Sequence, residues 1–412
     1  MARIPPIQIL AVLLGLPSLI LAQTSSSPSP PPQPQPSQPP SRATASTTST
    51  QTQSPTASPL QNIPCNNSPL LCTRAYDNVT HMGAHDSSFL RDASTSNSLA
   101  GNQYFNATVA LSAGIRLLSA QVHSSSSSGT LQLCHSYCEL LDAGPLADWL
   151  SAIRYWLDGN PNEVVTLLLV NSDNQPASAF GSAFDSAGIS HYGYVPPSSS
   201  SSSSSNNSSS SSNTTTTTWP TLESMISSNK RLVTFIASVP DPPSPDHPFL
   251  LPEFRYVFET SYNITSASHF GCDLDRPSSA GSASEALGKG MMGLVNHFRY
   301  IDLGSGGIQI PDVGNIEITN SPSLVNGSGN LGEHLTRCQG GWGGRKPVFA
   351  LVDFFDKGPS VEAAGLMSGL KGDDIVGRTA PTAKSTSGAV KEGGSGVVAA
   401  LVGFLGIALV LL

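Results

Sequence analysis

The sequence predicts an α/β fold, a distorted TIM-type (β/α)8 barrel formed by a single domain with disordered Ser/Thr/Pro-rich flanks. Short apolar runs alternate with helical patterns between residues 63 and 370, and such repeated alternation is typical of an α/β barrel. The middle runs are continuously apolar, as in parallel strands buried on both faces. A doubly wound open sheet is the alternative, but the sequence has no glycine-rich dinucleotide-binding or P-loop segment to favour it.

The expected strands are short segments rich in Val, Leu, Ile and Phe, at 79–83, 115–122, 130–134, 164–170, 232–237, 255–259, 292–296 and 348–354. The clearest helix is expected at 145–157, where Leu146, Trp149, Leu150 and Ile153 fall on one stripe and Pro145 stands near the start. Shorter helices are expected at 222–229, 331–338 and 361–370.

Composition divides the chain into segments. Residues 1–22 have the positive start, apolar stretch and small last residue of a secretory signal peptide. Residues 23–62 are mostly Ser, Thr, Pro and Gln and cannot bury a core, so we expect a disordered, O-glycosylated stalk. The barrel is assigned to 63–370, with a disordered polar insertion at 198–218, and a flexible linker is assigned to 371–396.

Residues 397–412 are apolar and uncharged, and they follow a cluster of small residues and a short polar spacer. This order is typical of a GPI-anchor signal, with attachment expected at Ser387 or Gly388. A C-terminal transmembrane helix is the alternative, disfavoured because a span needs about 20 apolar residues and no basic residue follows the segment. We therefore expect a secreted protein held by lipid at the plasma membrane or cell wall.

Six cysteines, an even number, are expected to form disulfides in an oxidising compartment. Proximity in sequence pairs Cys65 with Cys72 and Cys134 with Cys138, which leaves Cys272 with Cys338, although six cysteines allow 15 pairings. A zinc site is the alternative, but no Cys-x-x-Cys with matching histidines occurs. Several Asn-x-Ser/Thr sequons indicate a glycosylated surface; they include those that begin at Asn66, Asn78, Asn106, Asn207, Asn213, Asn263 and Asn326.

The formal net charge of −8 and the lack of a basic run exclude nucleic acid as an expected partner. Polar side chains instead follow the expected strands, and barrels carry their chemistry where the carboxyl ends of the strands converge. These side chains belong to His85, Asp86, His135, Asn171, Asn296, His297 and Asp353. A histidine titrates near pH ~6.5, so two of them can give and take a proton.

Seven segments together resemble the secreted fungal branch of the PLC-like phosphodiesterases, the superfamily that includes phosphatidylinositol-specific phospholipase C. They are 83–87, 114–118, 133–135, 160–165, 272–277, 294–298 and 349–355. They span nearly the whole folded region in the order that the family shows. The resemblance implies an irregular barrel and cleavage of a phosphodiester.

The resemblance also implies roles. In active members one histidine takes the proton of the inositol 2-hydroxyl, which attacks phosphorus and expels diacylglycerol, while a second histidine protonates the leaving oxygen. By position, His85 matches the base and His135 the acid. Asp86 matches the carboxylate that supports the acid, and Asp353 is the candidate that orients His85. General acid–base catalysis of this kind is worth ~10²–10⁴-fold per group.

One departure from the family concerns charge. Active members stabilise the phosphoryl oxygens with an arginine or with calcium held by carboxylates, but here the corresponding positions are Ser119 and Gln121, and Asn171 replaces another carboxylate. Neutral amides and hydroxyls hold calcium poorly, so we expect no metal and no cofactor. Arg116, Gln121, Asn171, Asn296 and His297 are expected to bind the head group. We interpret Arg276, in Asp-Arg-Pro, as a structural salt bridge at a turn in preference to a phosphate ligand.

The leading hypothesis is a phosphoric diester hydrolase that acts on an inositol-type phosphodiester at the cell surface. The rival is a catalytically impaired surface glycoprotein that binds a head group or glycan in the same pocket. A glycoside hydrolase ranks last, because it needs two carboxylates across a cleft. The expected partners are a phospholipid or inositol phosphate head group and, through the anchor, a membrane; we expect a monomer.

Overall fold

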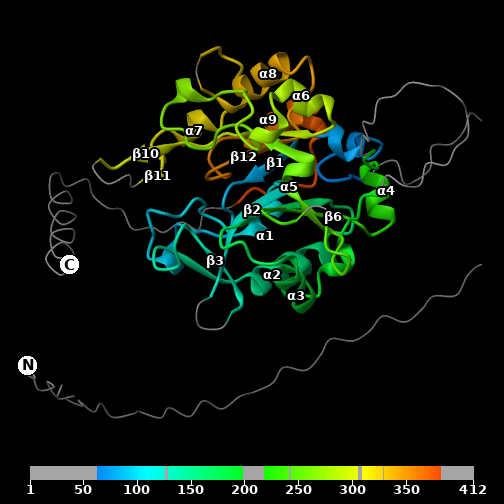
Figure 1. The fold of residues 1–412 in the computed structure, drawn as a ribbon. Helices are drawn as coiled ribbons and strands as arrows, with labels where there is room; N and C mark the ends of the chain where they lie inside the picture. Colours follow the sequence, from blue (N-terminus) through cyan, green and yellow to red (C-terminus); the bar gives the residue numbers. More distant parts are fainter. Residues whose placement is uncertain are drawn as a thin grey trace, which may run out of the picture. The chain divides into compact units, whose positions relative to one another are not determined.

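The computed structural model describes residues 63–125, 129–197, 218–240, 243–304, 309–327 and 329–381. Eight parallel strands form the main sheet, in the order β7-β6-β5-β2-β1-β12-β9-β8 (Figure 1). They are β1 (His81–Ala84), β2 (Leu117–Ser124), β5 (Val165–Asn171), β6 (Leu232–Ala237), β7 (Leu250–Pro252), β8 (Val257–Glu259), β9 (Met292–Asn296) and β12 (Phe349–Val352).

From β1 through β2, β5, β6 and β7, and then from β8 through β9 to β12, neighbouring strands follow one another in chain order. The last strand, β12, pairs in parallel with the first, β1. In the described part of the chain, β7 and β8 are the edge strands, and a single helical turn, α5 (Glu253–Tyr256), joins them. The two edges are therefore close, and the sheet curls into a barrel with one open seam. This confirms the predicted α/β fold, a distorted TIM-type barrel.

The helices on the outside of the barrel are short and uneven in length. They are α1 (Ala107–Ser112), α2 (Leu146–Gly159), α3 (Ala177–Ser186), α4 (Leu222–Ser227), α6 (Ala283–Gly288), α7 (Ile316–Thr319), α8 (Leu331–Gly341) and α9 (Ser360–Met367). Local sequence explains several starts: Asn106 caps α1, and Ser282 with Glu285 forms a capping box at α6. The predicted helices at 145–157, 222–229, 331–338 and 361–370 correspond to α2, α4, α8 and α9.

Two expected strands differ from the structure. The segment 130–134 forms β3 (Leu131–Cys134), which is antiparallel to the end of β2 and pairs with β4 (Asp142–Pro145), so it is not a barrel strand. Only a short loop separates it from β2, whereas a parallel return needs a long crossover. The segment 255–259 is divided between α5 and β8. A separate hairpin, β10 (Tyr300–Asp302) with β11 (Gln309–Pro311), flanks the mouth.

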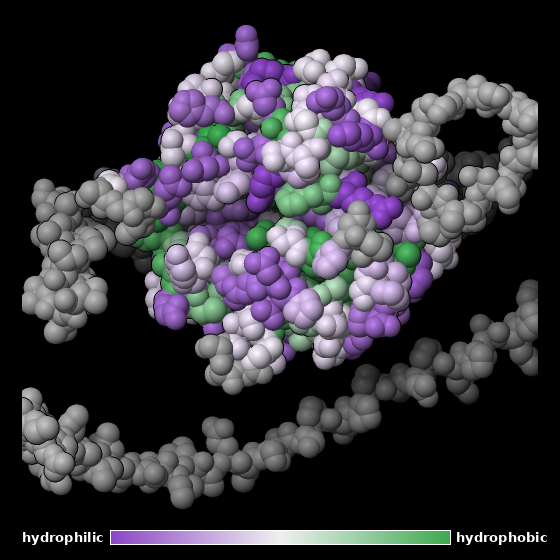
Figure 2. Space-filling view, in the orientation of Figure 1, coloured by the Kyte–Doolittle hydropathy of each residue, from purple (hydrophilic) through white to green (hydrophobic). Residues whose placement is uncertain are grey.

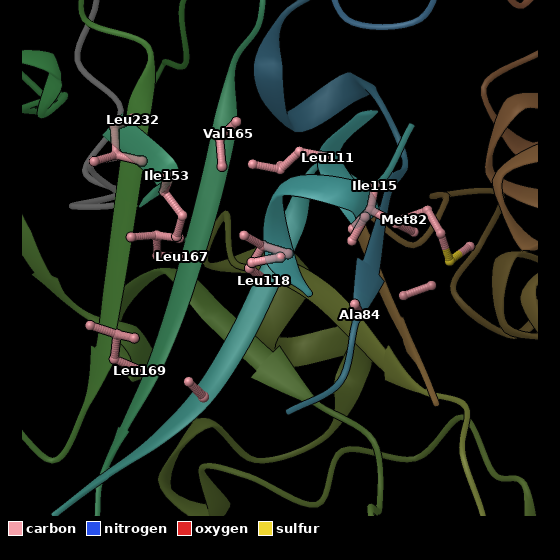
Figure 3. Close-up of a cluster of buried hydrophobic side chains, with 14 of the residues drawn as sticks. Met82, Ala84, Leu111, Ile115, Leu118, Ile153, Val165, Leu167, Leu169 and Leu232 are labelled. Atoms are coloured by element: carbon pink, nitrogen blue, oxygen red, sulfur yellow. The ribbon is translucent and has the colours of Figure 1, made fainter. Parts of the chain in front are cut away.

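The core consists of two layers that the strand alternation separates. Along β5, Leu167 and Leu169 pack outward against the helices, while Leu168 packs inside the barrel. Figure 3 shows the outer layer, with Leu118 of β2 and Ile153 of α2 beside Leu167. Each fully buried leucine of this kind contributes about 1.5–3 kcal/mol of apolar burial.

The inward positions change from apolar to polar toward the carboxyl end of the strands. On β2 this face reads Leu117, Ser119 and Gln121, and Leu117 belongs to the inner core whereas Ser119 and Gln121 line a cavity. Asn296, two residues after Leu294 on β9, lines the same cavity. The alternation of each strand thus gathers polar side chains at one mouth of the barrel.

The three disulfides are those predicted from proximity: Cys65–Cys72, Cys134–Cys138 and Cys272–Cys338. Among the described residues, none of the helices combines the length and apolar character that a membrane span needs. The segments predicted as signal peptide, stalk and hydrophobic tail lie outside the described residues, as do Ser387, Gly388 and nearly all of the polar insertion. The Asn66 side chain is buried and accepts a hydrogen bond from Val164 N, so this sequon is not free for a glycan.

Candidate acid–base site at the barrel mouth

A cavity of about 460 Å³ lies at the carboxyl ends of the strands. His85, Asp86, Gln121, His135 and Asn296, all named as candidate site residues from the sequence, are among the residues that line it. Its floor includes Leu168 and Leu351 from the inner core, and Tyr300 and Gln309 of the β10–β11 hairpin form part of its wall. Figure 2 shows the surface hollowed between the β10–β11 side and the β3 side, with mainly hydrophilic residues at the edges of the hollow.

His85 follows β1 and is fixed through one ring nitrogen. Its Nδ1 lies 2.9 Å from Asp353 Oδ1 at the end of β12, the strand that pairs with β1. The Nδ2 of Asn102 also donates to this oxygen, over 3.0 Å, so the carboxylate is itself held in place. With Nδ1 bonded to Asp353, Nε2 is left to exchange protons with a ligand.

Asp86 lies between the two histidines. Its Oδ2 is 3.6 Å from His85 Nε2 and 3.7 Å from His135 Nε2, and it accepts a hydrogen bond of 2.7 Å from Gln121 Nε2. The Asp86 backbone has φ of 44°, a left-handed conformation that aspartate adopts more readily than most residues. Its backbone N–H donates to Ser119 Oγ over 2.9 Å, which stabilises this turn.

His135 reaches the mouth by an indirect route. It follows β3, which runs antiparallel to β2, so the chain goes out along β2 and returns to place His135 near Gln121. The Ser136 N–H donates to Gln121 Oε1 over 3.0 Å, and the His135 N–H donates to Leu141 O over 2.9 Å. Gln121 therefore links Asp86 to the segment that carries His135.

The pKa values of the two histidines shift in opposite directions. Burial disfavours a charged ring at His85, but the carboxylates of Asp86 and Asp353 outweigh it and raise the pKa of His85. At His135 burial dominates and lowers the pKa, although Asp86 opposes it. In the free protein a single proton shared by the pair therefore resides mainly on His85.

Two of the predicted head-group ligands, Arg116 and Asn171, do not line the cavity. Inward positions on β2 and β5 are occupied by Leu117 and Val170, so each of these neighbours points the other way. Arg116 pairs with Glu163 at the opposite end of the barrel, with Nη2 2.6 Å from Oε2. Asn171 donates to Gln175 O over 2.9 Å and holds a loop.

His297 is also outside the cavity, again because of strand alternation. Asn296 points inward, so its neighbour points outward into a fully buried cluster. There His297 Nδ1 lies 2.9 Å from His334 Nδ1, and His297 Nε2 lies 2.9 Å from Thr319 O. Burial lowers the pKa of both rings, that of His334 to about 4. His297 therefore lies outside the cavity that holds His85 and His135 and packs in a buried cluster.

The structure also places residues in the cavity that were not among the predicted site residues. Glu259, the last residue of β8, and Arg276 both line it, and Arg276 Nη2 lies 2.5 Å from Glu259 Oε2. Phe298, next in the inward series after Asn296, lines it too. The two-residue alternation along the strands could have indicated Glu259 and Phe298. Glu259 follows Val257 on the inward face of β8, and Phe298 follows Leu294 and Asn296, which are inward residues of β9.

One group with metal-ligand spacing occurs among the described residues, formed by Cys272, His334 and Cys338. Both cysteines are joined in a disulfide, so neither offers a thiolate to zinc.

A sequence model of the family described as PI-PLC X 1 matches residues 71–368. A PI-PLC X domain-containing protein 1 from Arthroderma benhamiae is 35% identical over 317 residues, covering 77% of this chain and 92% of that protein. An uncharacterized secreted protein from the same fungus is 33% identical over 300 residues, covering 73% of this chain and 62% of that protein.

Among solved structures, the phosphatidylinositol-specific phospholipase C from Listeria monocytogenes aligns with a TM-score of 0.43 and 13% identity, covering 72% of this chain and 95% of that one. A variant of the corresponding enzyme from Staphylococcus aureus aligns with a TM-score of 0.41 and 12% identity, covering 73% of this chain and 94% of that one.

Proposed function

The chain belongs to the PI-PLC X domain family, and on this premise we propose that it is a phosphoric diester hydrolase that cleaves an inositol-type phosphodiester by acid–base catalysis. The observation that carries the proposal is the position of one carboxylate oxygen. Oδ2 of Asp86 lies within 3.7 Å of both His85 Nε2 and His135 Nε2 in the wall of one cavity. Two imidazoles so placed can take a proton from one side of a ligand and give a proton to the other.

In the proposed step, Nε2 of His85 accepts the proton of a ring hydroxyl, whose oxygen forms a bond to phosphorus. The bond between phosphorus and the alcohol leaving group breaks, and His135 gives its proton to the leaving oxygen. The products are a cyclic phosphodiester and a free alcohol, with His85 charged and His135 neutral. Asp353 holds His85 through Nδ1 and stabilises the imidazolium that forms.

The starting form for this step has its proton on His135, whereas the free protein favours His85. An anionic phosphate bound beside His135 favours the charged ring and raises its pKa. Ligand binding thus moves the proton toward the reactive arrangement. No metal or cofactor takes part in the proposed step.

We also propose that the protein acts outside the cell, as a monomer attached by a GPI anchor to the plasma membrane or cell wall. Three disulfides support an oxidising compartment, and one relative is named a secreted protein. Deleting residues 397–412 tests the anchor: the protein should then pass into the medium, whereas continued attachment would exclude this anchor.

A binding function without turnover is the second candidate, and Gln121 favours it. By the family resemblance, active members have an arginine or a calcium ligand at this position, whereas Gln121 has a neutral amide. The Gln121 amide donates to Asp86 Oδ2. Without charge stabilisation, an acid–base pair alone gives a slow reaction.

Turnover of phosphatidylinositol in mixed vesicles, measured as release of cyclic inositol phosphate by the full-length secreted protein, separates these candidates. His85→Gln and His135→Gln should each lower the rate by about 10²–10⁴-fold. His123→Gln is the matched control, because His123 also pairs with an aspartate, Asp173, at 3.2 Å but does not line the cavity. Binding of inositol phosphate without any turnover would favour the binding protein, and turnover that survives His85→Gln would exclude the proposed mechanism.

A further inference from the structure

One guanidinium lies in the wall of the cavity that holds the two histidines. Among the described residues that line it, Arg276 is the single lysine or arginine. We infer that Arg276 contacts a phosphate oxygen of the ligand and provides the positive charge that Gln121 does not. This inference rests on the proposed function, since it concerns the ligand of the same site, and it revises the interpretation of Arg276 as a purely structural residue.

Arg276 is held rigidly from three sides. Its backbone pairs with β8, with the Glu259 N–H donating to Arg276 O over 2.8 Å. Its Nη2 lies 2.5 Å from Glu259 Oε2. The guanidinium carbon lies 4.5 Å from the centre of the Tyr262 ring and 5.8 Å from that of Phe254. A cation fixed in this way loses little conformational entropy when a ligand binds.

Most donors of this guanidinium have no hydrogen-bond partner among the described residues, although Nε itself is buried. Arginine has five N–H groups in a planar fork that matches phosphate oxygens. The structure gives the Arg276 side chain one hydrogen bond, to Glu259, and Nε has no partner. The side chain is 36% exposed, which leaves it open to the cavity. A residue with only a structural role would instead use its donors within the protein.

Two buried acids, Glu253 and Glu259, lie near Arg276, but they differ in their tendency to be charged. Glu253 and Glu259 are both buried, and burial together with the Glu259 carboxylate raises the pKa of Glu253 well above its usual range. Burial alone would raise the pKa of Glu259 as well, but hydrogen bonds from Glu253, Arg276 and Asn296 lower it. Of the two acids, Glu259 is thus the one that favours the charged form, and Arg276 pairs with it.

The remaining charges in the wall explain why a phosphodiester needs Arg276. The acids that line the cavity are Asp86 and Glu259, and both repel an anion. Arg276 and a protonated histidine are the groups in this wall that attract one. Replacing Arg276 by a neutral residue would leave net negative charge around the bound phosphate.

Arg276 and His85 line the same cavity. Glu259, which holds Arg276, is close enough to contribute to the raised pKa of His85. Asn296 donates to Glu259 Oε2 over 3.1 Å and is aligned with Leu351 of β12, the strand next to β1. The phosphate that Arg276 contacts is either the one being cleaved or a second phosphate on the head group. Replacing Arg276 should affect turnover in the first case and the preference for a second phosphate in the other.

Binding and turnover of Arg276→Gln in the full-length protein test the inference. Calorimetric titration with inositol 1-phosphate and with myo-inositol measures the contribution of the phosphate. We expect the wild type to prefer inositol 1-phosphate and the variant to lose about 10- to 100-fold of that preference. Arg276→Lys should retain part of it. Arg337→Gln is the matched control, because Arg337 pairs with Glu333 at 2.9 Å, is similarly exposed and does not line the cavity.

The outcomes are distinct. A loss of turnover on phosphatidylinositol in Arg276→Gln assigns the contact to the cleaved phosphate. Unchanged turnover on phosphatidylinositol with lost preference for inositol 1,4-bisphosphate over inositol 1-phosphate assigns it to a second phosphate. Arg276-dependent phosphate binding in a wild type that shows no turnover would exclude the proposed function but support this inference. Turnover and phosphate binding that are insensitive to position 276, or no phosphate binding at all, would overturn it.

A second variant distinguishes the loss of a phosphate contact from misfolding of the protein. Arg276→Gln leaves Glu259 buried beside a neutral residue, which is costly. The double substitution Glu259→Gln with Arg276→Met removes both charges, and it should show the same loss of phosphate preference in a protein that melts cooperatively.

Discussion

The imidazole of His85 stacks on the ring of Phe298, with the ring centres 3.7 Å apart and 8° between the planes. Phe298 is buried, so this contact fixes the plane of His85 while Asp353 fixes its Nδ1 edge. A charged imidazole is also stabilised by the face of an aromatic ring. The position and the basicity of His85 therefore both depend on a residue that has no titratable group.

Substituting Phe298 by leucine tests this dependence. Leucine keeps the site apolar but removes the aromatic face, so the pKa of His85 should fall, because the charged ring loses ~1 kcal/mol of cation–π stabilisation. Titration of His85 by nuclear magnetic resonance measures the change. An unaltered pKa would mean that the stack is packing alone.

Substituting Asp353 by asparagine should move the alkaline limb of the kcat/KM profile. The pKa of His85 is raised and that of His135 is lowered, so the last proton of the pair is lost mainly from His85, and this loss sets the alkaline limb. Asp353→Asn removes one of the carboxylates that raise the pKa of His85, so this limb should shift to lower pH, and kcat should fall about 10²-fold or more because the ring loses its ionic partner. A limb that stays in place would assign the alkaline transition to another group.

The pH dependence of kcat/KM in the wild type should be bell-shaped with a low maximum. The raised pKa of His85 and the lowered pKa of His135 make the form with neutral His85 and charged His135 a minor one in the free protein. The two apparent pKa values belong to the pair. Rate profiles with a soluble inositol phosphodiester check this, and a profile with one limb instead of two would contradict it.

Acid should destabilise the fold through buried histidines. Burial lowers the pKa of His81 to about 4, while an unfolded histidine titrates near 6.5. The unfolded chain therefore binds more protons between these values, and stability present above pH 6.5 is lost as pH falls toward 4. His81 alone should cost about 2 kcal/mol of unfolding free energy between pH 7 and pH 5. Denaturant unfolding of His81→Gln should show a smaller loss over this range, whereas substitution of the exposed His269 should not reduce it.

The disulfides should differ in what they contribute. Cys134–Cys138 closes a loop with a sequence separation of 4, next to His135, whereas Cys272–Cys338 has a separation of 66. Loop entropy predicts a stability loss of about 2 kcal/mol on removing the first and about 4 kcal/mol on removing the second. Paired alanine variants, compared by thermal unfolding and turnover, should show that losing Cys134–Cys138 has the greater effect on activity, because that loop carries His135.

The expected and observed positions of polar side chains differ mainly between neighbours on a strand. Asn296 and His297 were both expected in the pocket, although successive residues on a strand face opposite sides, and only Asn296 lines it. Arg116 and Asn171 were misplaced for the same reason. Applied strictly, the alternation selects Gln121, Glu259 and Asn296 instead, all of which line the cavity.

The sequence by itself predicted the barrel class, the pairing of the six cysteines and the position of His85 and Asp86 after the first strand, because apolar periodicity, cysteine spacing and strand ends are local properties of the chain. Only the tertiary structure decided that β3 returns antiparallel to carry His135 back to the mouth, that Phe298 stacks on His85, and that Arg276 joins them. These relationships depend on strand register and on contacts between segments far apart in the chain, and the free energy that selects them comes from packing the whole barrel.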